Sequence, residues 1–398
     1  MSMSKGLLDG VKVLDLTRVL AGPYCGMMLA DMGADVTKIE LPGRGDDARK
    51  NGPFVNGESA YYMNLNRNKR GMTLNLKSEE GKKIFKELVK QSDIVLENYR
   101  PGVMKRLGLD YEELKKINPT IIYGAVSGFG QYGPYSDRAG YDILGQAMSG
   151  LMSTTGWPGT GPTRTGTAMS DVLGGLSVCI GVLAAYVNRL RTGEGDMVDV
   201  SLVDSTVSSL EIINMIYLCT GRVPKPIGNR YEAIGPYDSF RAKDGMVIIA
   251  CGNDKLYEKF KEVLQIPELN DPLYATNALR VENYAPLKEI IEGWTADKTI
   301  DEVVDTLLAA GIPSGPINTI DRVVKDPHIA GARQMFVELP HPVAGDMKIT
   351  GNQIKLTNHP VKIERPAPTL GQHTEEILAE KLGMSHEECQ KLKEEGVF

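Results

Sequence analysis

The sequence of 398 residues is poor in cysteine and lacks a long apolar segment near its start. Its five cysteines, at positions 25, 179, 219, 251 and 389, are scattered and include no CxxC pair, so neither a disulfide framework nor a zinc site is expected. The opening residues, MSMSKGLLDGVKVLDL, contain no apolar signal core. We therefore expect a protein of the reducing cytoplasm with no metal.

Positive charge is also in short supply. The chain has 45 Lys and Arg against 51 Asp and Glu, and its net charge is −6. Binding to phosphate backbones or anionic lipids needs a basic face, so neither a nucleic-acid nor a membrane partner is expected. The longest apolar stretch, 176–187, is too short to span a bilayer and predicts a buried helix instead.

What the sequence does contain is a regular alternation of strand-like and helix-like segments. This alternation favours an α/β fold with a doubly wound, Rossmann-like parallel sheet. The predicted strands are 11–17, 34–42, 93–99 and 120–128, and the predicted helical segments between them are 22–33, 78–91 and 102–117.

The second half of the chain changes character at 221–238, which is rich in Pro and Gly and predicts a linker. After it, FRAKDGMVIIACGND predicts a hairpin around Asp244-Gly245, followed by helices up to about residue 311. The length of the chain and this pattern predict a second, smaller α+β domain. The tail adds two short strands and a last helix, TEEILAEKLG.

One motif is misleading. Residues 128–133 match GxGxxG and follow a predicted strand, as a dinucleotide-binding loop should. Pro134 and the following SDRAG, however, offer no helix whose N-terminus could hold a pyrophosphate. We predict a flexible loop here and keep dinucleotide binding as the weaker alternative. The turn at 17–23 could bind an anion through free N–H groups, although an ordinary strand-to-helix turn has the same spacing.

Several cations are concentrated in this acidic chain. They could line the path of an anionic ligand, or they could form a solvated face with scattered ion pairs. The residues are Arg67, Lys69, Arg70, Lys77, Arg100, Lys105 and Arg106.

The stretch TGTAMSDVLGG, 165–175, holds a single carboxylate among small residues. Because an apolar helical run follows, Ser170 or Asp171 is expected to cap a helix. The alternative is that Asp171 is a nucleophile, kept ionised by the helix dipole and accessible between small neighbours. No GxSxG, HExxH or Walker motif competes with it, and all five histidines lie at 328 or beyond.

Five ordered motifs resemble the family III CoA-transferases, the group of formyl-CoA and carnitine CoA-transferases. They run from about residue 7 to LGQHTEEIL, and the resemblance looks closest to the succinyl-CoA:dicarboxylate branch. The motifs are DLTRVLAGPYCGMMLADMGADVTKIELPGRGDDAR, NRNKRGMTLNLK, VLENYRPGVMKRLGLDYEEL, SGFGQYGPYSDRAGYD and AMSD.

The resemblance implies a homodimer of two interlocked rings. In each subunit a large Rossmann-like CoA-binding domain would begin with 1–220 and be completed by a return linker and C-terminal part, 321–398. The linker and small α+β domain would occupy 221–320, and its loop 250–254 would close over reaction intermediates.

The resemblance also implies the chemistry. Asp171 would attack an acyl-CoA, form a mixed anhydride and then an aspartyl-CoA thioester, and pass CoA to a free acid. Coenzyme A would be a co-substrate, with no nicotinamide, flavin or metal. Lys77 and Arg106 would meet its phosphates, and Tyr141 its pantetheine end. The positions that match the family's CoA contacts are Val19, Ala21, Leu74, Lys77, Asn98, Tyr99, Arg106, Leu107 and Tyr141.

The sequence departs from the formyl-CoA transferase pattern in three places. Leu20 stands where that pattern has Gln and 251–254 replaces its glycine run, so oxalate and formate are not expected as acids. Leu41 replaces a basic residue, for which Arg44 could substitute. An α-methylacyl-CoA racemase is the main rival, although Tyr141 stands where its histidine is expected. A non-catalytic CoA-binding subunit is the second.

Overall fold

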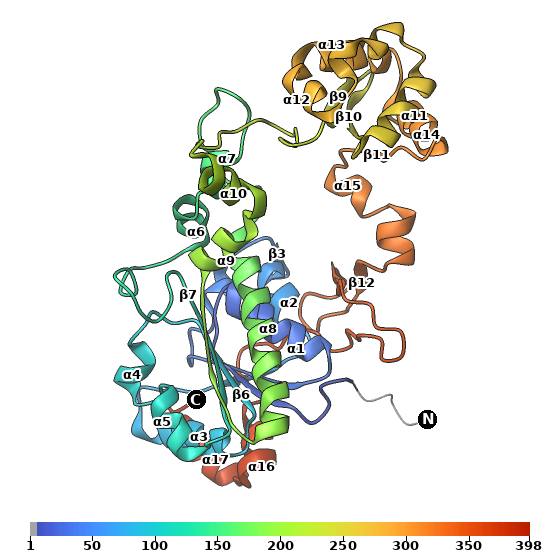
Figure 1. Cartoon of the computed structure of the whole chain (residues 1–398). Helices are drawn as coiled ribbons and strands as arrows, with labels where there is room; N and C mark the ends of the chain where they lie inside the picture. The colour runs from blue at the N-terminus through green and yellow to red at the C-terminus, as the bar shows by residue number, and fades with distance from the viewer. Residues whose placement is uncertain (1–5) are drawn as a thin grey trace. The chain divides into compact units, whose positions relative to one another are not determined.

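The computed structural model describes residues 6–398, which divide into two compact units (Figure 1). The first unit comprises 1–152, 164–223 and 328–398, of which residues 1–5 lie outside the described part. The second comprises 153–163 and 224–327. The sequence did not indicate that 153–163 belongs to the second unit.

The first unit is built on a six-stranded sheet in which every pairing is parallel. The strand order is β5-β2-β1-β6-β7-β8, which is the 3-2-1-4-5-6 order of the Rossmann fold. The prediction of a doubly wound parallel sheet is therefore confirmed. The strands are β1 (Lys12–Asp15), β2 (Asp35–Glu40), β5 (Arg70–Thr73), β6 (Ile94–Glu97), β7 (Ile122–Ser127) and β8 (Met197–Ser201).

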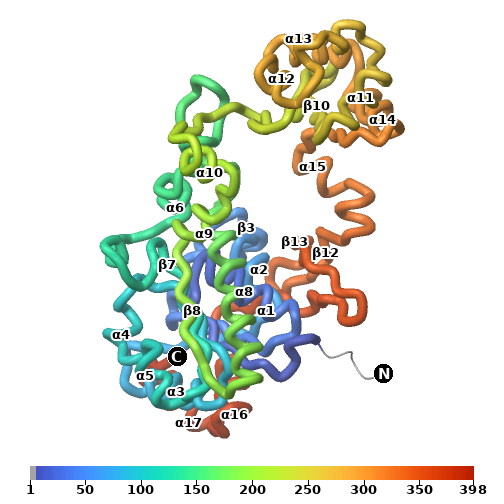
Figure 2. The backbone as a smooth tube through the Cα atoms, in the orientation of Figure 1, coloured from blue at the N-terminus to red at the C-terminus, as the bar shows by residue number. Residues whose placement is uncertain are grey.

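Helices cover both faces of this sheet (Figures 1 and 2). Val13 and Leu14 are neighbours in β1 but belong to different apolar cores, because successive strand residues point to opposite faces. One core is completed by α1 (Ala21–Asp31) and α8 (Met169–Thr192), and the other by α3 (Glu79–Lys90), α5 (Tyr111–Ile117), α16 (Thr374–Leu382) and α17 (His386–Glu394).

The remaining elements of the first unit are short. The predicted helical segment 102–117 is in fact two helices, because Gly108 ends the first with φ +68°. The elements are β3 (Phe54–Val55), β4 (Glu58–Ser59), α2 (Ala60–Asn66), α4 (Val103–Leu107), α6 (Asp142–Met148), α9 (Leu202–Ser209), α10 (Glu211–Thr220), β12 (Phe336–Glu338) and β13 (Lys348–Thr350). The short helix α7 (Leu151–Thr154) begins in the first unit and ends in the second.

The basic segment at 67–70 is neither a ligand path nor a solvated face, so both interpretations of it were wrong. Arg67, Lys69 and Arg70 are buried and pair with Asp31, Asp15 and Asp35 at 2.7, 2.8 and 2.9 Å. Strand β5 runs through this segment and carries the charges into the core. Buried charges of this kind are tolerated only when they are paired.

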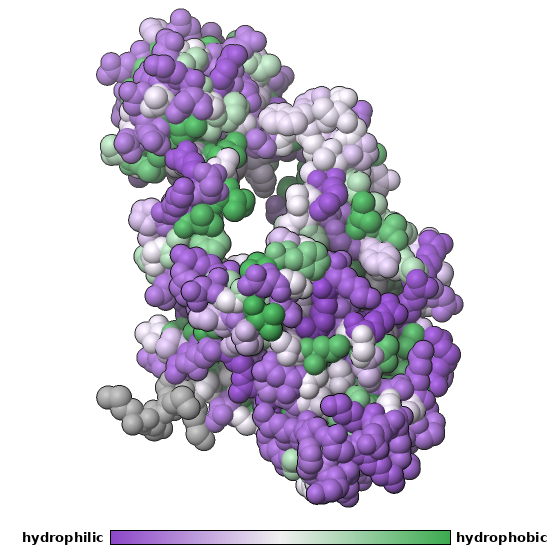
Figure 3. Space-filling view, turned by 180° about the vertical axis from the view of Figure 1, so that it is seen from behind, coloured by the Kyte–Doolittle hydropathy of each residue, from purple (hydrophilic) through white to green (hydrophobic). Residues whose placement is uncertain are grey.

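The C-terminal part is bound to the first unit by backbone and side-chain contacts. Asn68 donates to the carbonyl oxygen of Lys362 at 2.8 Å and accepts from the N–H groups of Glu364 and Arg365. Arg70 in turn binds Glu376 and Glu380 of α16. Figure 3 shows a mainly hydrophilic surface at the end of the unit that carries α16 and α17.

The second unit has a three-stranded antiparallel sheet of order β11-β10-β9. The predicted hairpin is confirmed, since Ala242 pairs with Gly245 across the turn Lys243-Asp244. In the 250–254 loop, Asp254 forms an ion pair with the fully buried Arg280. The elements are β9 (Tyr237–Ala242), β10 (Gly245–Ala250), β11 (Ser314–Pro316), α11 (Asp254–Leu264), α12 (Asn277–Glu282), α13 (Tyr284–Thr295), α14 (Ile300–Ala309) and α15 (Ile320–Val323).

By length and composition, α8 could cross a membrane, and the bent pair α9 and α10 would count as another span if taken together. The helix is thus longer than the apolar stretch suggested, and it is buried along one side only. Val178, Cys179 and Val182 pack into the core, whereas Ile180 and Leu190 are exposed. A single helix of this kind is weak evidence for a membrane span.

Contact between α1 and α8 depends on a glycine. A Cβ atom at Gly175 would lie 2.6 Å from the carbonyl oxygen of Ala21 and 3.0 Å from Cβ of Tyr24. We expect Gly175→Ala to lower the free energy of unfolding by about 2 kcal/mol, because the two helices must separate. Urea denaturation measures the change.

The matched control for that substitution is Gly293→Ala in α13, where the added Cβ would meet no described atom within 4 Å apart from the adjoining backbone of its own helix. It should be neutral or stabilising, since alanine favours helices over glycine by about 1 kcal/mol. Equal stability of the Gly175→Ala protein and the unsubstituted protein would show that the close helix contact is not required.

Candidate active site

The carboxyl ends of β1 and β6 form a crevice at the point where the strand order reverses. Asn98, just beyond β6, accepts the N–H of Arg18 and donates to the carbonyl oxygen of Arg18, both at 2.7 Å. In open parallel sheets ligands bind at this position. A cavity of about 190 Å³ opens here, lined by residues of 18–21, 98–101, 126–128 and 138–141 and by Asp171.

The turn after β1 is held in an unusual backbone conformation. Val19 has φ +69°, which costs a β-branched residue on the order of 1–3 kcal/mol. Its N–H donates to Oδ1 of Asp46 at 3.0 Å, and the other oxygen of Asp46 accepts from Nζ of buried Lys38 at 2.8 Å. Although burial raises the pKa of Asp46, Lys38 and these hydrogen bonds bring it below its ordinary value. A buried ion pair thus fixes the wall of the cavity.

Asp171 lies in the first turn of α8 but does not cap it, so the prediction of a helix cap at 170 or 171 was wrong. The N-cap is Ala168, whose side chain makes no capping bond. Oδ1 of Asp142 accepts instead from the N–H groups of Ser170, at 2.8 Å, and Asp171, at 3.3 Å. Within residues 6–398 no hydrogen bond to the carboxylate of Asp171 is present, so this group stays available.

The electrostatic surroundings of Asp171 also differ from the expectation. Burial, and then the negative charge of Asp142, raise the pKa of Asp171 to about 7. These effects outweigh the helix dipole, which by itself favours the ionised form. Burial and the charges of Asp171 and Asp46 also raise the pKa of Tyr61 to about 12. Asp171 is therefore a carboxyl group close to half ionised at neutral pH, with a phenol nearby.

Two functional side chains near Asp171 were missed from the sequence. Asp142 supplies the true cap of α8, and Gln146 positions it by donating to its second oxygen at 2.8 Å. Gln146 also accepts the N–H of Thr165 at 2.9 Å. The only signal in the sequence was Asp142 itself, which directly follows Tyr141 at the start of α6.

A second cavity of about 230 Å³ shares Arg18 and Tyr99 with the first. Its walls include the apolar side chains of Leu74 and Leu107, and its cations are Arg18, Arg44 and Lys77. The guanidinium of Arg18 lies 5.3 Å from the centre of the Tyr99 ring, between the two cavities. Together they can hold an elongated ligand with an apolar planar group and several negative charges.

The predicted contact residues are distributed over these cavities. Val19, Ala21, Asn98, Tyr99 and Tyr141 line the cavity of Asp171, and Leu74, Lys77, Tyr99 and Leu107 line the second. Arg106 lies apart from both, in a neighbouring cleft of about 380 Å³ that also contains Lys105. Leu41 and Arg44 both line the second cavity, so a cation is present beside the expected basic position.

The GxGxxG segment forms a loop, as predicted. Gly128 and Gly140 close its base so tightly that a Cβ at Gly128 would lie 2.5 Å from the Cα of Gly140. No helix begins within 128–133, and the first helix after this segment is α6 at Asp142. The segment therefore lacks the helix N-terminus of a dinucleotide site.

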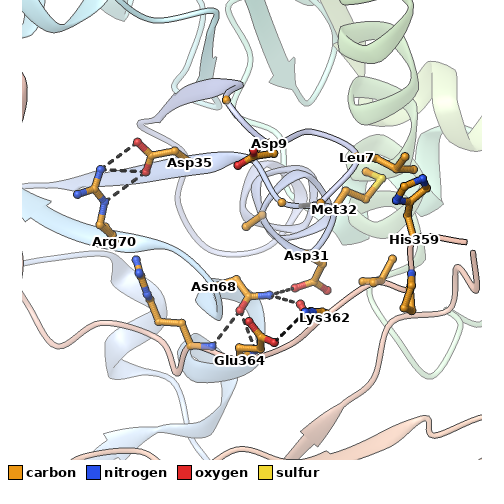
Figure 4. A pocket seen from close by; sticks show the side chains of 18 of the residues that line it. Leu7, Asp9, Asp31, Met32, Asp35, Asn68, Arg70, His359, Lys362 and Glu364 are labelled. Carbon is orange, nitrogen blue, oxygen red and sulfur yellow. Dashed lines mark hydrogen bonds and ion pairs between the residues drawn. The ribbon is translucent and has the colours of Figure 1, made fainter. Parts of the chain in front are cut away.

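A larger cavity, of about 820 Å³, lies at the opposite, amino-terminal ends of β1, β2 and β5 (Figure 4). Several of the polar side chains that line it form ion pairs or hydrogen bonds with one another. Arg70 pairs with Asp35, and Asn68 donates to Oδ1 of Asp31 at 2.8 Å. No cluster of His, Cys, Asp and Glu suited to a metal occurs in the described part of the chain.

The fold and the site define a class of α/β proteins with Rossmann strand order, in which a basic, partly apolar cavity leads to a partly buried carboxyl group. The family model described as CoA-transferase family III matches residues 8–374, and the chain belongs to this family. The predicted resemblance is confirmed, and the protein is an enzyme of the CoA-transferase class.

Two curated relatives and one solved structure show how close the similarity is. The chain is 40% identical to succinyl-CoA:glutarate CoA-transferase of Mus musculus, over 98% of this chain and 90% of that protein. It is 42% identical to acetyl-CoA:oxalate CoA-transferase of Acetobacter aceti, over 92% and 93%. A CAIB/BAIF family protein from Brucella suis has a TM-score of 0.84 at 40% identity, covering 95% and 100%.

The raised pKa of Asp171 predicts a pH-dependent cost to stability. Between its unfolded pKa of about 4 and its native pKa of about 7, the native state binds more protons, so stability falls as pH rises. We expect Asp171→Asn to raise the free energy of unfolding by on the order of 3 kcal/mol at pH 8 and by little at pH 4. Denaturant titrations at both pH values measure this difference.

The control is Asp137→Asn, which removes an exposed carboxylate from a loop of the same unit. Its effect should be small and nearly the same at the two pH values. If Asp171→Asn raised the free energy of unfolding equally at both pH values, the result would contradict the raised pKa of Asp171.

Proposed function

We propose that the protein moves CoA from an acyl-CoA to a free carboxylic acid by way of covalent intermediates on Asp171. The observation that carries the proposal is the carboxyl group of Asp171, which has no hydrogen-bond partner among residues 6–398. It lines the first cavity, which shares Arg18 and Tyr99 with the second cavity, where the cations Arg44 and Lys77 lie beside apolar side chains. The family to which the chain belongs supports the reaction class.

The proposed sequence of steps conserves the thioester. A carboxylate oxygen of Asp171 attacks the carbonyl carbon of the thioester and forms a C–O bond to it. The C–S bond of the thioester then breaks, and CoA leaves as a thiolate. The thiolate attacks the aspartyl carbonyl of the mixed anhydride and releases the first acid. The second acid then displaces CoA from the aspartyl thioester, and the thiolate attacks the new acyl group, which regenerates Asp171.

The surroundings of Asp171 suit this role. Its pKa of about 7 leaves much of it ionised at neutral pH, while the absence of hydrogen bonds leaves both oxygens free to attack. The backbone N–H groups of Leu20 and Ala21 line this cavity and have no hydrogen-bond partner among residues 6–398, so they are candidates for binding the oxyanions. That the 250–254 loop closes over the reaction intermediates stays a prediction.

We propose that coenzyme A spans the two cavities with its nucleotide end at Arg44 and Lys77. Arg18 would lie along the path of the diphosphate, and Leu74 and Leu107 would flank the adenine. The uncharged pantetheine arm would then pass Tyr99 and Asn98 toward Asp171. Contact of Arg106 with a phosphate stays a prediction that requires its side chain to leave the neighbouring cleft.

For substrates, we propose succinyl-CoA or another dicarboxylic acyl-CoA with a dicarboxylic acceptor. Several relatives support this choice by name, among them the mouse succinyl-CoA:glutarate enzyme and a succinate–glutarate CoA-transferase of Agrobacterium fabrum. The relative from Acetobacter aceti is named for oxalate, so oxalate belongs in the set of acids to be tested despite Leu20.

We also propose the interlocked homodimer. Its support in this chain is an exposed apolar face of α8, where Ile180, Val187 and Leu190 are 67, 56 and 68% exposed. Large exposed apolar side chains along one face of a helix are typical of protein interfaces. A second copy of the chain is the occupant that the family resemblance implies.

Substitution of the nucleophile is the main test. We expect Asp171→Asn and Asp171→Ala to lower kcat at least about 1000-fold and to leave the Kd for CoA within threefold, because only the covalent steps need the carboxylate. In the unsubstituted protein kcat should rise with pH through about 7. The assay incubates several acyl-CoAs with a pool of acids and identifies new thioesters by mass spectrometry.

The same samples, quenched during turnover, should carry an acyl or CoA adduct on the peptide with Asp171. Asp346→Asn, which removes an exposed carboxylate from the loop between β12 and β13, serves as the control and should keep full activity. Exchange at full rate by Asp171→Ala would refute the proposal. Uptake of deuterium at the α-carbon without thioester exchange would instead indicate the racemase.

The nucleotide end of the site is tested separately. We expect Arg44→Ala and Lys77→Ala each to raise KM for the acyl-CoA about tenfold with little change in kcat, because ground-state and transition-state binding are weakened equally. With thioesters of 3′-dephospho-CoA, which lack one phosphate, the rise in KM should be smaller for at least one of the two variants. Lys83→Ala, on the exposed face of α3, is the control, and unchanged KM in both variants would contradict the assignment.

A further inference from the structure

Three arginines line the cavity of Asp171: Arg18, Arg100 and Arg138. Arg18 pairs with Asp47 at 3.1 Å and lies against Tyr99, at the passage to the second cavity. In the described part of the chain, Arg100 and Arg138 have no acidic partner within ion-pair distance. The cavity therefore holds more positive charge than its own carboxylates neutralise.

Coenzyme A does not account for these two cations. Its phosphates belong at the nucleotide end, beside Arg44 and Lys77, and its pantetheine arm carries no charge. Asp171 does not account for them either, because its pKa is raised by burial and by Asp142 and no cation contributes. The reaction also brings the CoA thiolate and the reacting carboxylate to this cavity, but both of these must reach the acyl carbonyl beside Asp171. On a dicarboxylic acid a second carboxylate remains, and inside the cavity it needs a cation of its own.

Of the two cations, Arg138 is the one held in place. Its guanidinium stacks on the ring of Tyr135, 3.7 Å from the centre, and Tyr135 in turn meets the ring of Phe129 edge-on at 6.0 Å. The loop that carries all three is closed at its base by the contact of Gly128 with Gly140. Stacking of this kind reduces the entropy lost when an arginine binds a carboxylate.

We propose that Arg138 binds the non-reacting carboxylate of the transferred acid and thereby selects dicarboxylic over monocarboxylic acids. This inference rests on the proposed function of Asp171. It also gives the 128–140 loop a role, since the loop serves as an aromatic support that presents Arg138 at the cavity, next to Tyr141. A bidentate guanidinium–carboxylate pair gives the geometric specificity that this selection needs.

The experiment compares glutarate with valerate, which has the same chain length but one carboxylate. In Arg138→Met we expect kcat/KM for glutarate to fall about 100-fold and that for valerate to change less than threefold. Arg138→Lys should recover part of the loss, because lysine keeps the charge but not the planar fork. Tyr135→Leu should give a smaller loss for glutarate alone, since only the support is removed.

Arg191→Met, at the exposed end of α8, is the control and should behave as the unsubstituted protein. The Kd of each variant for CoA, measured by calorimetry, should be unchanged and shows that the variant is folded. Equal losses for both acids in Arg138→Met would overturn the inference. Loss of selectivity in Arg100→Met but not in Arg138→Met would overturn it as well.

Failure of the proposed function would look different. It would appear as no exchange by the unsubstituted protein with any pair of acids, or as full activity of Asp171→Ala. Exchange that depends on Asp171 but is equally fast with glutarate and valerate would overturn the role of Arg138 alone.

Discussion

The buried ion pair between Lys38 and Asp46 determines the shape of the site. Both side chains are almost fully excluded from solvent, and the nearby carboxylates of Asp15 and Glu40 also favour the charged form of Lys38. Lys38 also donates to the carbonyl oxygen of Thr17, and Asp46 accepts the N–H of strained Val19. Removing one partner of such a pair leaves an unpaired buried charge and typically costs about 3–5 kcal/mol. Because both partners also bind the backbone of the turn after β1, the ion pair fixes the conformation of this turn beside the cavity.

The site follows from this fixed turn. Asn98 joins the turn to the end of β6, so two strands that are distant in sequence present one continuous wall. On the other side of the cavity, Asp142 satisfies the free N–H groups at the start of α8, which leaves Asp171 without that task. A carboxyl group that is neither capping a helix nor paired with a cation keeps its oxygens free, and its burial raises its pKa toward neutrality.

Much of the fold was predictable because periodicity is a local property. The alternation of strands and helices and the hairpin at Asp244-Gly245 were both visible in the sequence. Strand β5 was missed because its residues, Arg70 to Thr73, begin with a charge and follow other cations. A basic segment is normally exposed, and only the partners Asp15, Asp31 and Asp35 from other elements explain why this one is buried.

The sequence by itself determined the order of the elements and the family, since both depend on residue types at fixed spacings. Through the family resemblance it also led to the prediction that Asp171 is the central carboxyl group. Only the tertiary structure decided that Asp142 rather than Asp171 caps α8, and that Lys69 supports the core rather than a ligand. It also showed that Arg18 and Tyr99 join two cavities. The physical reason is that burial, charge and hydrogen-bond partners depend on segments far apart in the chain, which no local pattern records.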